Sequence, residues 1–362
     1  MVQRLFSHRL IVVALFVALV LLFVSCTPSH PQSTFDAKGP VAANQLNLFW
    51  VIFWAALAVF IAVVGLLIYT VVRFREKPGQ SLPVQTHGHR TLEITWTIIP
   101  ALLLAAIAVM TIRTIFELRA PPSDNPFQIE VIAHQWWWEV IYPEQNITTA
   151  NEIVVPVNRD VSVTLNSYDV LHSFWIPKLA GKKDIVPNKT NTTWFNAEEV
   201  GVFYGQCAEF CGIAHALMKL QVEAKTEEEF EKWLDDQRTL PVIPTTGLAA
   251  EGLQVFNSKG CLVCHTTAGP DTVAIRESRQ QAFLDGQALT HAPNLTHFAS
   301  RTTFAGAILD NTEENLRQWL KNPEEVKPGN RMARLAAAFN NSELRLSEDD
   351  IIALVAYLQT LE

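Results

Sequence analysis

Two long apolar runs near the N-terminus limit the folds open to this chain more than any other feature. Residues 47–72 are 26 consecutive residues without a charge, and residues 94–112 are a further 19. A helix needs about 20 apolar residues to cross a bilayer, so both runs predict membrane-spanning helices within a hairpin over residues 44–118. The loop between them is rich in Arg and Lys, which marks the cytoplasmic side of a membrane. The chain beyond about residue 120 is therefore predicted to lie outside the cytoplasm.

Residues 1–26 have the pattern of an export signal. Positive residues precede an apolar run at 10–24, which is too short for an ordinary span, and Val-Ser-Cys follows at 24–26. The small residue before Cys26 resembles a bacterial lipobox, which predicts a lipoprotein anchored through this cysteine. A plain signal, or a third short span with an idle thiol, is the alternative.

The exported part has a net negative balance and two different sequence patterns. The whole chain carries a formal net charge of −8, which argues against a nucleic-acid partner held by phosphate contacts. Residues 126–225 alternate apolar and polar residues, as at Ile129, Val131 and Ala133, and turn residues separate these runs. This pattern predicts an antiparallel β-sandwich or barrel of about 100 residues.

One loop of this β domain gathers soft metal ligands. Cys207, Cys211, His215 and Met218 lie within twelve residues, and His172, at a predicted strand, can supply a further imidazole. Two Cys and two His can bind zinc, but a thioether favours copper. A mononuclear blue-copper site needs one Cys, so two thiolates favour a binuclear copper centre. A disulfide is the alternative reading of paired exported cysteines.

The last third of the chain predicts a second exported domain. Residues 226–246 form a linker that starts with a charged helical segment, whose Phe230, Trp233 and Leu234 make an apolar stripe. In residues 247–362, the motif CLVCH at 261–265 is typical of covalent haem c attachment, with His265 as the iron ligand. Amphipathic segments at 247–259, 313–322 and 348–361 predict the short helices of a class I cytochrome c.

A distal haem ligand can be selected by elimination. The chain has four methionines, and Met332 is the one in this domain. His/Met ligation raises the haem potential, as suits an electron carrier. His291 and His297 are the rival ligands, and we expect each to cap a helix or to make a local hydrogen bond.

The motifs together resemble a known family. YGQCAEFCGIAHALM at 204–218, DVLHSFWIP at 169–177, HQWWW at 134–138 and LEITWTIIP at 92–100 are similar to subunit II of the haem–copper cytochrome c oxidases. The resemblance implies a cupredoxin barrel with a binuclear copper centre, CuA. Its implied ligands are His172, Cys207, Cys211, His215, Met218 and the backbone carbonyl of Glu209.

The resemblance also implies roles for three further side chains. The Glu209 side chain would reach a Mg ion at the boundary with subunit I. Trp136 would be an electron-entry residue, although aromatic residues near a membrane are more often packing or interfacial. We expect at least one of Trp136, Trp137 and Trp138 to face outward. Glu93 would stand at the mouth of a proton path into subunit I; the simpler reading is a solvated carboxylate.

The fused C-terminal domain narrows the resemblance to the caa3-type oxidases. PNLTHF at 293–298 and KPGNRM at 327–332 resemble their cytochrome domain. This implies a respiratory-chain enzyme subunit in the bacterial plasma membrane, with its copper and haem domains on the periplasmic side. Its partners would be subunit I, where oxygen is reduced and protons are translocated, subunit III, and cytochrome c or another small electron donor. The copper-A subunit of a nitric oxide reductase and a stand-alone electron shuttle are the alternatives.

Overall fold

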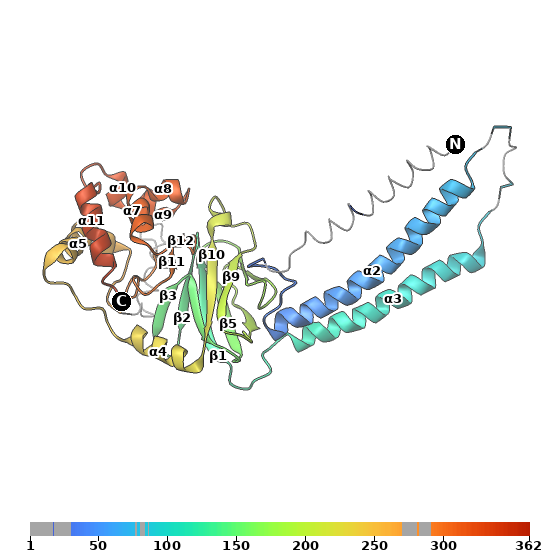
Figure 1. The fold of residues 1–362 in the computed structure, drawn as a ribbon, viewed down its shortest axis with the longest axis horizontal. Coiled ribbons are helices and arrows are strands. Elements are labelled where there is room, and N and C mark those ends of the chain that lie inside the picture. The colour runs from blue at the N-terminus through green and yellow to red at the C-terminus, as the bar shows by residue number, and fades with distance from the viewer. Residues whose placement is uncertain are drawn as a thin grey trace.

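The computed structural model describes residues 17, 30–76, 78–79, 84–85, 87–269, 281 and 291–362. The predicted export signal and Cys26 lie outside the described residues. The order of the parts confirms the predicted fold class: two long apolar helices, then a β domain, then a helical domain. The helical domain packs on the end of the β domain that is opposite to the helical hairpin (Figure 1).

The hairpin consists of α2 (Pro40–Arg73) and α3 (Arg90–Glu117), which run side by side. With 34 and 28 residues, both are long and apolar enough to cross a membrane. Each helix extends beyond its apolar run, because polar residues at the ends continue the same backbone hydrogen bonding. Val41 at the start of α2 joins the core of the β domain and ties the hairpin to it.

Two five-stranded sheets pack face to face in the β domain, and apolar side chains fill the space between them. The first sheet has the order β3-β2-β1-β5-β8 and the second β4-β10-β9-β6-β7. The strands are β1 (Phe127–His134), β2 (Trp137–Tyr142), β3 (Ile147–Ala150), β4 (Glu152–Pro156), β5 (Val161–Ser167), β6 (His172–Trp175), β7 (Lys183–Ile185), β8 (Asn191–Phe195), β9 (Gly201–Cys207) and β10 (Lys219–Lys225).

The sheets are mixed, which corrects the prediction of a purely antiparallel domain. β1 pairs with β5 in parallel, and β4 pairs with β10 in parallel. Alternation of side chains shows which face of a strand is buried, but it is the same for parallel and antiparallel neighbours. The alternation itself is confirmed, since Ile129, Val131 and Ala133 are all buried.

The charged segment after β10 forms α4 (Glu227–Arg238), capped by the Thr226 side chain. Its predicted apolar stripe packs on the β domain: Phe230 and Leu234 are buried in that core, and Trp233 packs against it. The extended connection to the helical domain is therefore short, from residue 239 to residue 246.

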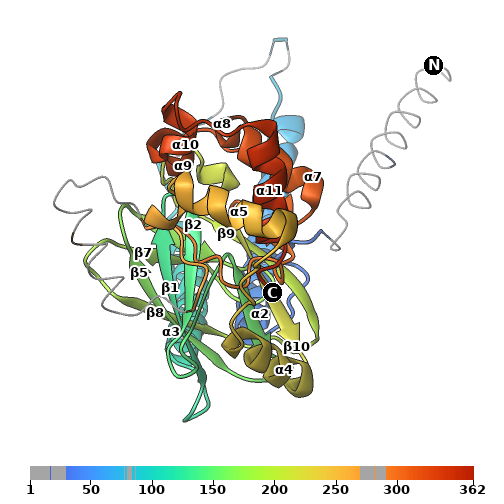
Figure 2. The same cartoon turned by 90° about the vertical axis from the view of Figure 1, so that its left-hand side faces the viewer.

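Figure 2 views the molecule from the helical domain, where α5 (Gly247–Ser258) and α11 (Glu348–Leu358) cross in front of the sheets. Gly252 of α5 lies against the backbone of Ala353, where no Cβ would fit, so these helices approach closely. The remaining elements are η2 (Cys261–Val263), β11 (Thr303–Phe304), β12 (Leu309–Asp310), α7 (Glu313–Lys321), α8 (Pro323–Val326), α9 (Arg331–Leu335) and α10 (Ala337–Asn340).

Candidate metal and haem sites

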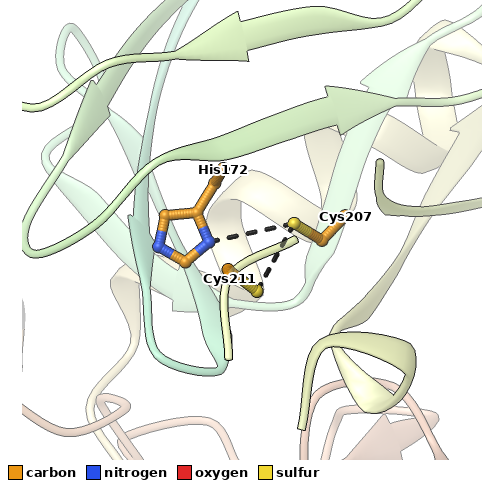
Figure 3. Close-up of side chains that lie close together, drawn as sticks. All are labelled: His172, Cys207 and Cys211. Atoms are coloured by element: carbon orange, nitrogen blue, oxygen red, sulfur yellow. Dashed lines mark hydrogen bonds between the residues drawn. The ribbon is translucent and has the colours of Figure 1, made fainter. Parts of the chain in front are cut away.

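A sulfur cluster lies where β6 and the loop after β9 meet. Cys207 ends β9, Cys211 follows in the loop, and His172 begins β6; all three are buried. The Cys207 Sγ is 3.7 Å from the Cys211 Sγ and 3.8 Å from His172 Nδ1 (Figure 3). A disulfide has an S–S distance of about 2.05 Å, so the two thiols face each other unbonded.

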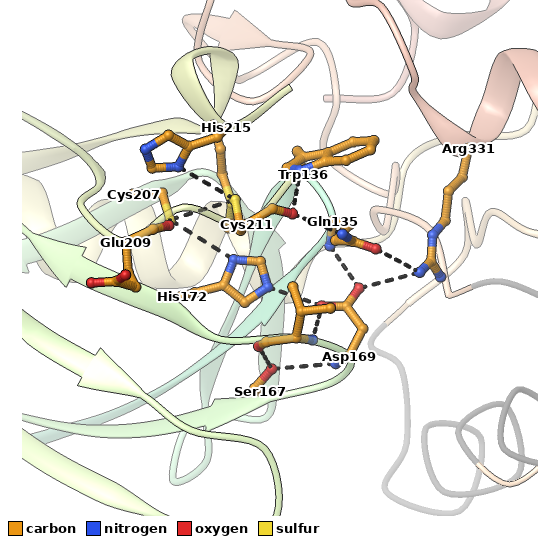
Figure 4. A network of polar contacts seen from close by, with 12 residues as sticks. Gln135, Trp136, Ser167, Asp169, His172, Cys207, Glu209, Cys211, His215 and Arg331 are labelled. Atoms are coloured by element: carbon orange, nitrogen blue, oxygen red, sulfur yellow. Dashed lines mark hydrogen bonds and ion pairs between the residues drawn. The ribbon is translucent and has the colours of Figure 1, made fainter. Parts of the chain in front are cut away.

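Three more predicted donors surround the two sulfur atoms. The Cys211 Sγ lies 3.5 Å from His215 Nδ1 and 3.8 Å from Met218 Sδ. The Cys207 Sγ lies 3.2 Å from the backbone oxygen of Glu209, whose carboxylate points away from the sulfur atoms (Figure 4). The short helix η1 (His215–Leu217) turns the chain so that the imidazole and the thioether reach the same sulfur atom.

The surroundings of the cluster prepare it for a metal. The neighbouring Cys211 thiol lowers the pKa of the Cys207 thiol, and the thiolate is the form that binds metals. Burial alone would lower the pKa of His172, but hydrogen bonds with Asp169 and Cys207 outweigh burial and raise it, so a metal has to compete with a proton for this ring. Its Nε2 donates to Asp169 Oδ1 at 2.9 Å, which fixes the ring with Nδ1 toward the sulfur.

This donor set fits the binuclear copper centre. Two thiolates, two imidazoles and a thioether lie around one point, and these soft and borderline ligands suit copper, with the Glu209 carbonyl as one additional, harder donor. The thioether of Met218 is completely buried against Cys211. A tetrahedral zinc site would leave it without a role.

The helical domain contains a cavity that fits a haem. Cys261, Cys264, His265 and Met332 all line it, together with apolar side chains such as Leu295 and Phe298. His265 Nδ1 donates to the carbonyl of Pro293 at 2.8 Å, so the neutral ring carries its lone pair on Nε2, the atom that binds iron. Cys261 and Cys264 lie three residues apart on this wall and directly before His265, which is the spacing that covalent haem attachment requires.

Trp136 lies between the two sites. It lines the haem cavity, and its Nε1 donates to the carbonyl of Cys211 at 3.0 Å. Gln135 Nε2 donates to the same carbonyl at 2.7 Å, and both bonds appear in Figure 4. Gln135 and Trp136 therefore line the haem cavity and also contact the backbone of the sulfur cluster.

The expectation that one tryptophan of the HQWWW motif faces outward is wrong. Trp136, Trp137 and Trp138 are 7%, 9% and 0% exposed. The helical domain covers the strand face that would otherwise meet solvent: Lys327 Nζ donates to the carbonyl of Trp136 at 2.6 Å.

The expectation is wrong for His291, whereas His297 does cap a helix, because the carbonyl that it contacts belongs to Gln237 in the last turn of α4. His291 Nε2 donates to Glu139 Oε1 of the β domain at 3.0 Å, and His297 Nε2 donates to the carbonyl of Gln237 at 2.9 Å. Neither bond is local, since 152 and 60 residues separate the partners.

Glu93 lies far from both sites, in the first turn of α3. Its Oε1 accepts a hydrogen bond from the backbone N–H of His89, whose ring in turn accepts from the N–H of Leu92. Glu93 thus helps to cap the helix, as acidic residues do at N-termini.

Sequence reasoning missed the polar residues that join the two domains around the copper site. Arg331 Nη2 lies 3.5 Å from Asp169 Oδ2 and donates to Gln135 Oε1 at 3.1 Å (Figure 4). Asp169 therefore contacts both His172 and the residue beside Met332. The sequence offered one signal for the role of Asp169, which is its position three residues before His172.

Comparison with known proteins agrees with this architecture. Three family models match: cytochrome c oxidase subunit II, transmembrane domain, over residues 28–114; cytochrome c oxidase subunit II, periplasmic domain, over 145–225; and cytochrome c over 249–362.

Relatives match over nearly the whole chain. Cytochrome c oxidase subunit 2 of Alkalihalophilus pseudofirmus is 37% identical over 95% of this chain and 95% of its own, and that of Bacillus subtilis is 33% identical over 96% and 97%. A solved structure, the periplasmic domain of subunit II of the cytochrome oxidase of Bradyrhizobium japonicum, is 33% identical over 33% of this chain and 96% of its own, with a TM-score of 0.31.

Proposed function

The chain belongs to the cytochrome c oxidase subunit II family, with a fused cytochrome c domain, and on that basis we propose that it is the electron-entry subunit of a caa3-type oxidase. Electrons would pass from a donor to haem c, then to CuA, and then to a haem in subunit I, where oxygen is reduced to water. The bound haem and copper would supply the one-electron carriers, and the residues of this chain hold and connect them.

One observation carries the proposal: the haem cavity and the sulfur cluster share Trp136. Its indole lines the cavity and also donates to the Cys211 carbonyl. Its backbone carbonyl is held by Lys327, which belongs to the helical domain. In this chain, the electron-entry residue of the family thus faces a domain of the same polypeptide instead of solvent.

The short connection keeps the two domains together. Residues 239–246 link α4, which is docked on the β domain, to α5. A tether of this length gives an effective concentration in the mM range, far above that of a diffusing carrier. The transfer from haem to copper is therefore intramolecular in the proposed scheme.

Stopped-flow oxidation of the reduced oxidase, followed at the haem c band, tests this scheme. We expect a rate that does not change with dilution and depends weakly on salt, because no charged carrier is captured in this step. Trp136→Leu should slow it, whereas Trp233→Leu, in α4 and outside the lining of the haem cavity, should not. A rate proportional to the concentration of the complex would contradict the proposal.

Further details of the proposal concern partners and location. Subunit I, with subunit III, would hold the hairpin in the bacterial plasma membrane, and cytochrome c or another small protein would reduce the haem. The half-buried Glu209 would bind Mg at the subunit I boundary, and Glu93 would lie at the mouth of a proton path. Lipidation of Cys26 would add an anchor, which mass spectrometry of the purified subunit would detect.

A further inference from the structure

A second cluster of metal-ligating groups lies outside the copper and haem sites. It consists of His134, the last residue of β1, Glu139 in β2 and His291 of the helical domain. The strands β1 and β2 pair so that Ile132 lies opposite Glu139. His134, two residues after Ile132, is therefore a diagonal neighbour of Glu139 on the same face of the sheet. His291 completes the cluster from the other side of the domain interface.

The distances in this cluster suit a single metal ion. His134 Nε2 lies 3.0 Å from Glu139 Oε2, and His291 Nε2 lies 3.0 Å from Glu139 Oε1. One ligand atom of each residue lies within 4.8 Å of the others. Donors bound to a tetrahedral zinc ion at about 2.1 Å lie about 3.4 Å from one another, so small movements would admit the ion.

Burial makes a carboxylate at this place costly. His134, Glu139 and His291 are 3%, 1% and 6% exposed. Burial would raise the pKa of Glu139, but the hydrogen bonds from both imidazoles outweigh it and lower the pKa, so the group is ionised at neutral pH. Buried charges in proteins are paired or coordinate metals. Burial also lowers the pKa of His134, which favours the neutral ring that binds metals.

A cavity beside the cluster offers an entry path and room for a water ligand. Its volume is about 270 Å³, and Glu139 and His291 form part of its wall. Most of the remaining wall is polar, and it includes Asn166, Ser167, Tyr168 and Lys189. A zinc ion with three protein ligands commonly takes a water molecule as its fourth.

We propose that His134, Glu139 and His291 bind one zinc ion, which joins the β domain to the cytochrome c domain. Two imidazoles and a carboxylate are a known donor set for zinc, whereas magnesium and calcium prefer oxygen alone. The site differs from CuA in having no sulfur. Because its ligands come from both domains, zinc binding stabilises the docked arrangement.

Metal binding to the full-length subunit with its copper and haem loaded tests the site. After treatment with a chelator that leaves both coppers in place, zinc is added in competition with a fluorescent chelator. We expect one tightly bound zinc per chain, and at least tenfold weaker binding in Glu139→Gln and His291→Asn. His297→Asn is the matched control, since His297 is equally buried at the same interface but outside the cluster.

A second measurement does not depend on how the variants fold. X-ray absorption at the zinc edge of the unsubstituted protein should show nitrogen and oxygen neighbours at about 2.0–2.2 Å and no sulfur. Failure of the copper-loaded protein to take up zinc, a sulfur neighbour, or unchanged affinity in variants that retain copper and haem would overturn the proposal.

Discussion

The described part of the chain contains two buried clusters of three metal-ligating residues, and they differ in how their ligands are assembled. The sulfur cluster of His172, Cys207 and Cys211 comes from one domain, mostly from one loop. The cluster of His134, Glu139 and His291 needs both domains. The first can form before the cytochrome domain docks, whereas the second exists only in the docked molecule.

A carboxylate takes a different part in each cluster. Asp169 lies behind His172, bonded to Nε2, and leaves Nδ1 directed toward the sulfur. Glu139 lies between two imidazoles, bonded to Nε2 of each. A carboxylate bonded to an imidazole therefore positions a metal ligand in the sulfur cluster. In the other cluster, the carboxylate is itself a metal ligand. The direction in which the imidazole points decides which of these two roles the carboxylate has.

The largest expected effect is the loss of metal from the sulfur cluster while the other cluster still binds its metal. Cys211→Ser should abolish the binuclear copper centre, because a hydroxyl does not replace a bridging thiolate. Copper analysis and the EPR signal of an electron shared by two coppers would show the loss. Zinc binding by the second cluster should remain. A persisting shared-valence signal would refute the binuclear assignment.

A smaller effect is expected from Asp169→Asn, which alters the support of His172 without removing a ligand. Loss of such supporting groups commonly lowers metal affinity by about ten- to a hundredfold. Copper titration against a competing chelator measures the change. Asp184→Asn, at an exposed position of β7, is the control and should have no effect. Equal affinity in the two variants would show that Asp169 does not position the ligand.

Lys327 gives a pH-dependent test of domain docking. Its Nζ donates to the carbonyls of Trp136 and Ala305, and burial lowers its pKa from 10.5 to about 7. A released lysine binds more protons than the buried one between about pH 7 and 10.5, so docking should strengthen as the pH rises through this window. Below about pH 7 both forms are protonated, and this contribution no longer changes.

Proteolysis of the linker at 239–246, normalised to cleavage of the free linker peptide, measures this docking. Cleavage should slow between pH 7 and 9 in the natural protein. In the variant Lys327→Met, the protease should cleave the linker about tenfold faster at pH 9, because each carbonyl left unpaired costs about 1–3 kcal/mol. In this variant, the protection of the linker from cleavage should also not increase with pH. Lys321→Met, on an exposed part of the same domain, should behave like the natural protein.

The smallest effect is expected from Arg331→Gln. The Arg331 side chain is 26% exposed, and Asp169, 3.5 Å away, keeps its hydrogen bonds to His172 and to the backbone of Gln135 without it. The pair should therefore contribute no more than an exposed one, about 0.2–1 kcal/mol. Linker cleavage should therefore change less than about fivefold, and the difference should shrink at high salt. If Arg331→Gln changed the rate of linker cleavage more than Lys327→Met does, the Arg331 contact would contribute more to docking than the Lys327 contacts, contrary to this prediction.

Local patterns in the sequence were sufficient for much of this protein. The two spans follow from the length of their unbroken apolar runs. The alternation in β1 and β5 and the helices α5, α7 and α11 follow from the periodicity of apolar residues, which each segment carries by itself. The CxxCH motif and the loop with Cys207, Cys211, His215 and Met218 place their ligands within a few residues of one another. Such groups are close in space whatever the remainder of the chain does.

Only the tertiary structure decided which residues meet across the domain interface. Glu139 and His291 are 152 residues apart, and Lys327 and Trp136 are 191 apart. Nothing in the neighbourhood of any of them in sequence indicates the partner. The mixed strand order and the burial of Trp138 are likewise decided by distant residues, but inside the β domain. The contacts of the Trp136 carbonyl and of His297 have the same origin as the pairs across the interface. They depend on how two separately folded cores pack together, and that packing is set by the shape and charge of complete surfaces.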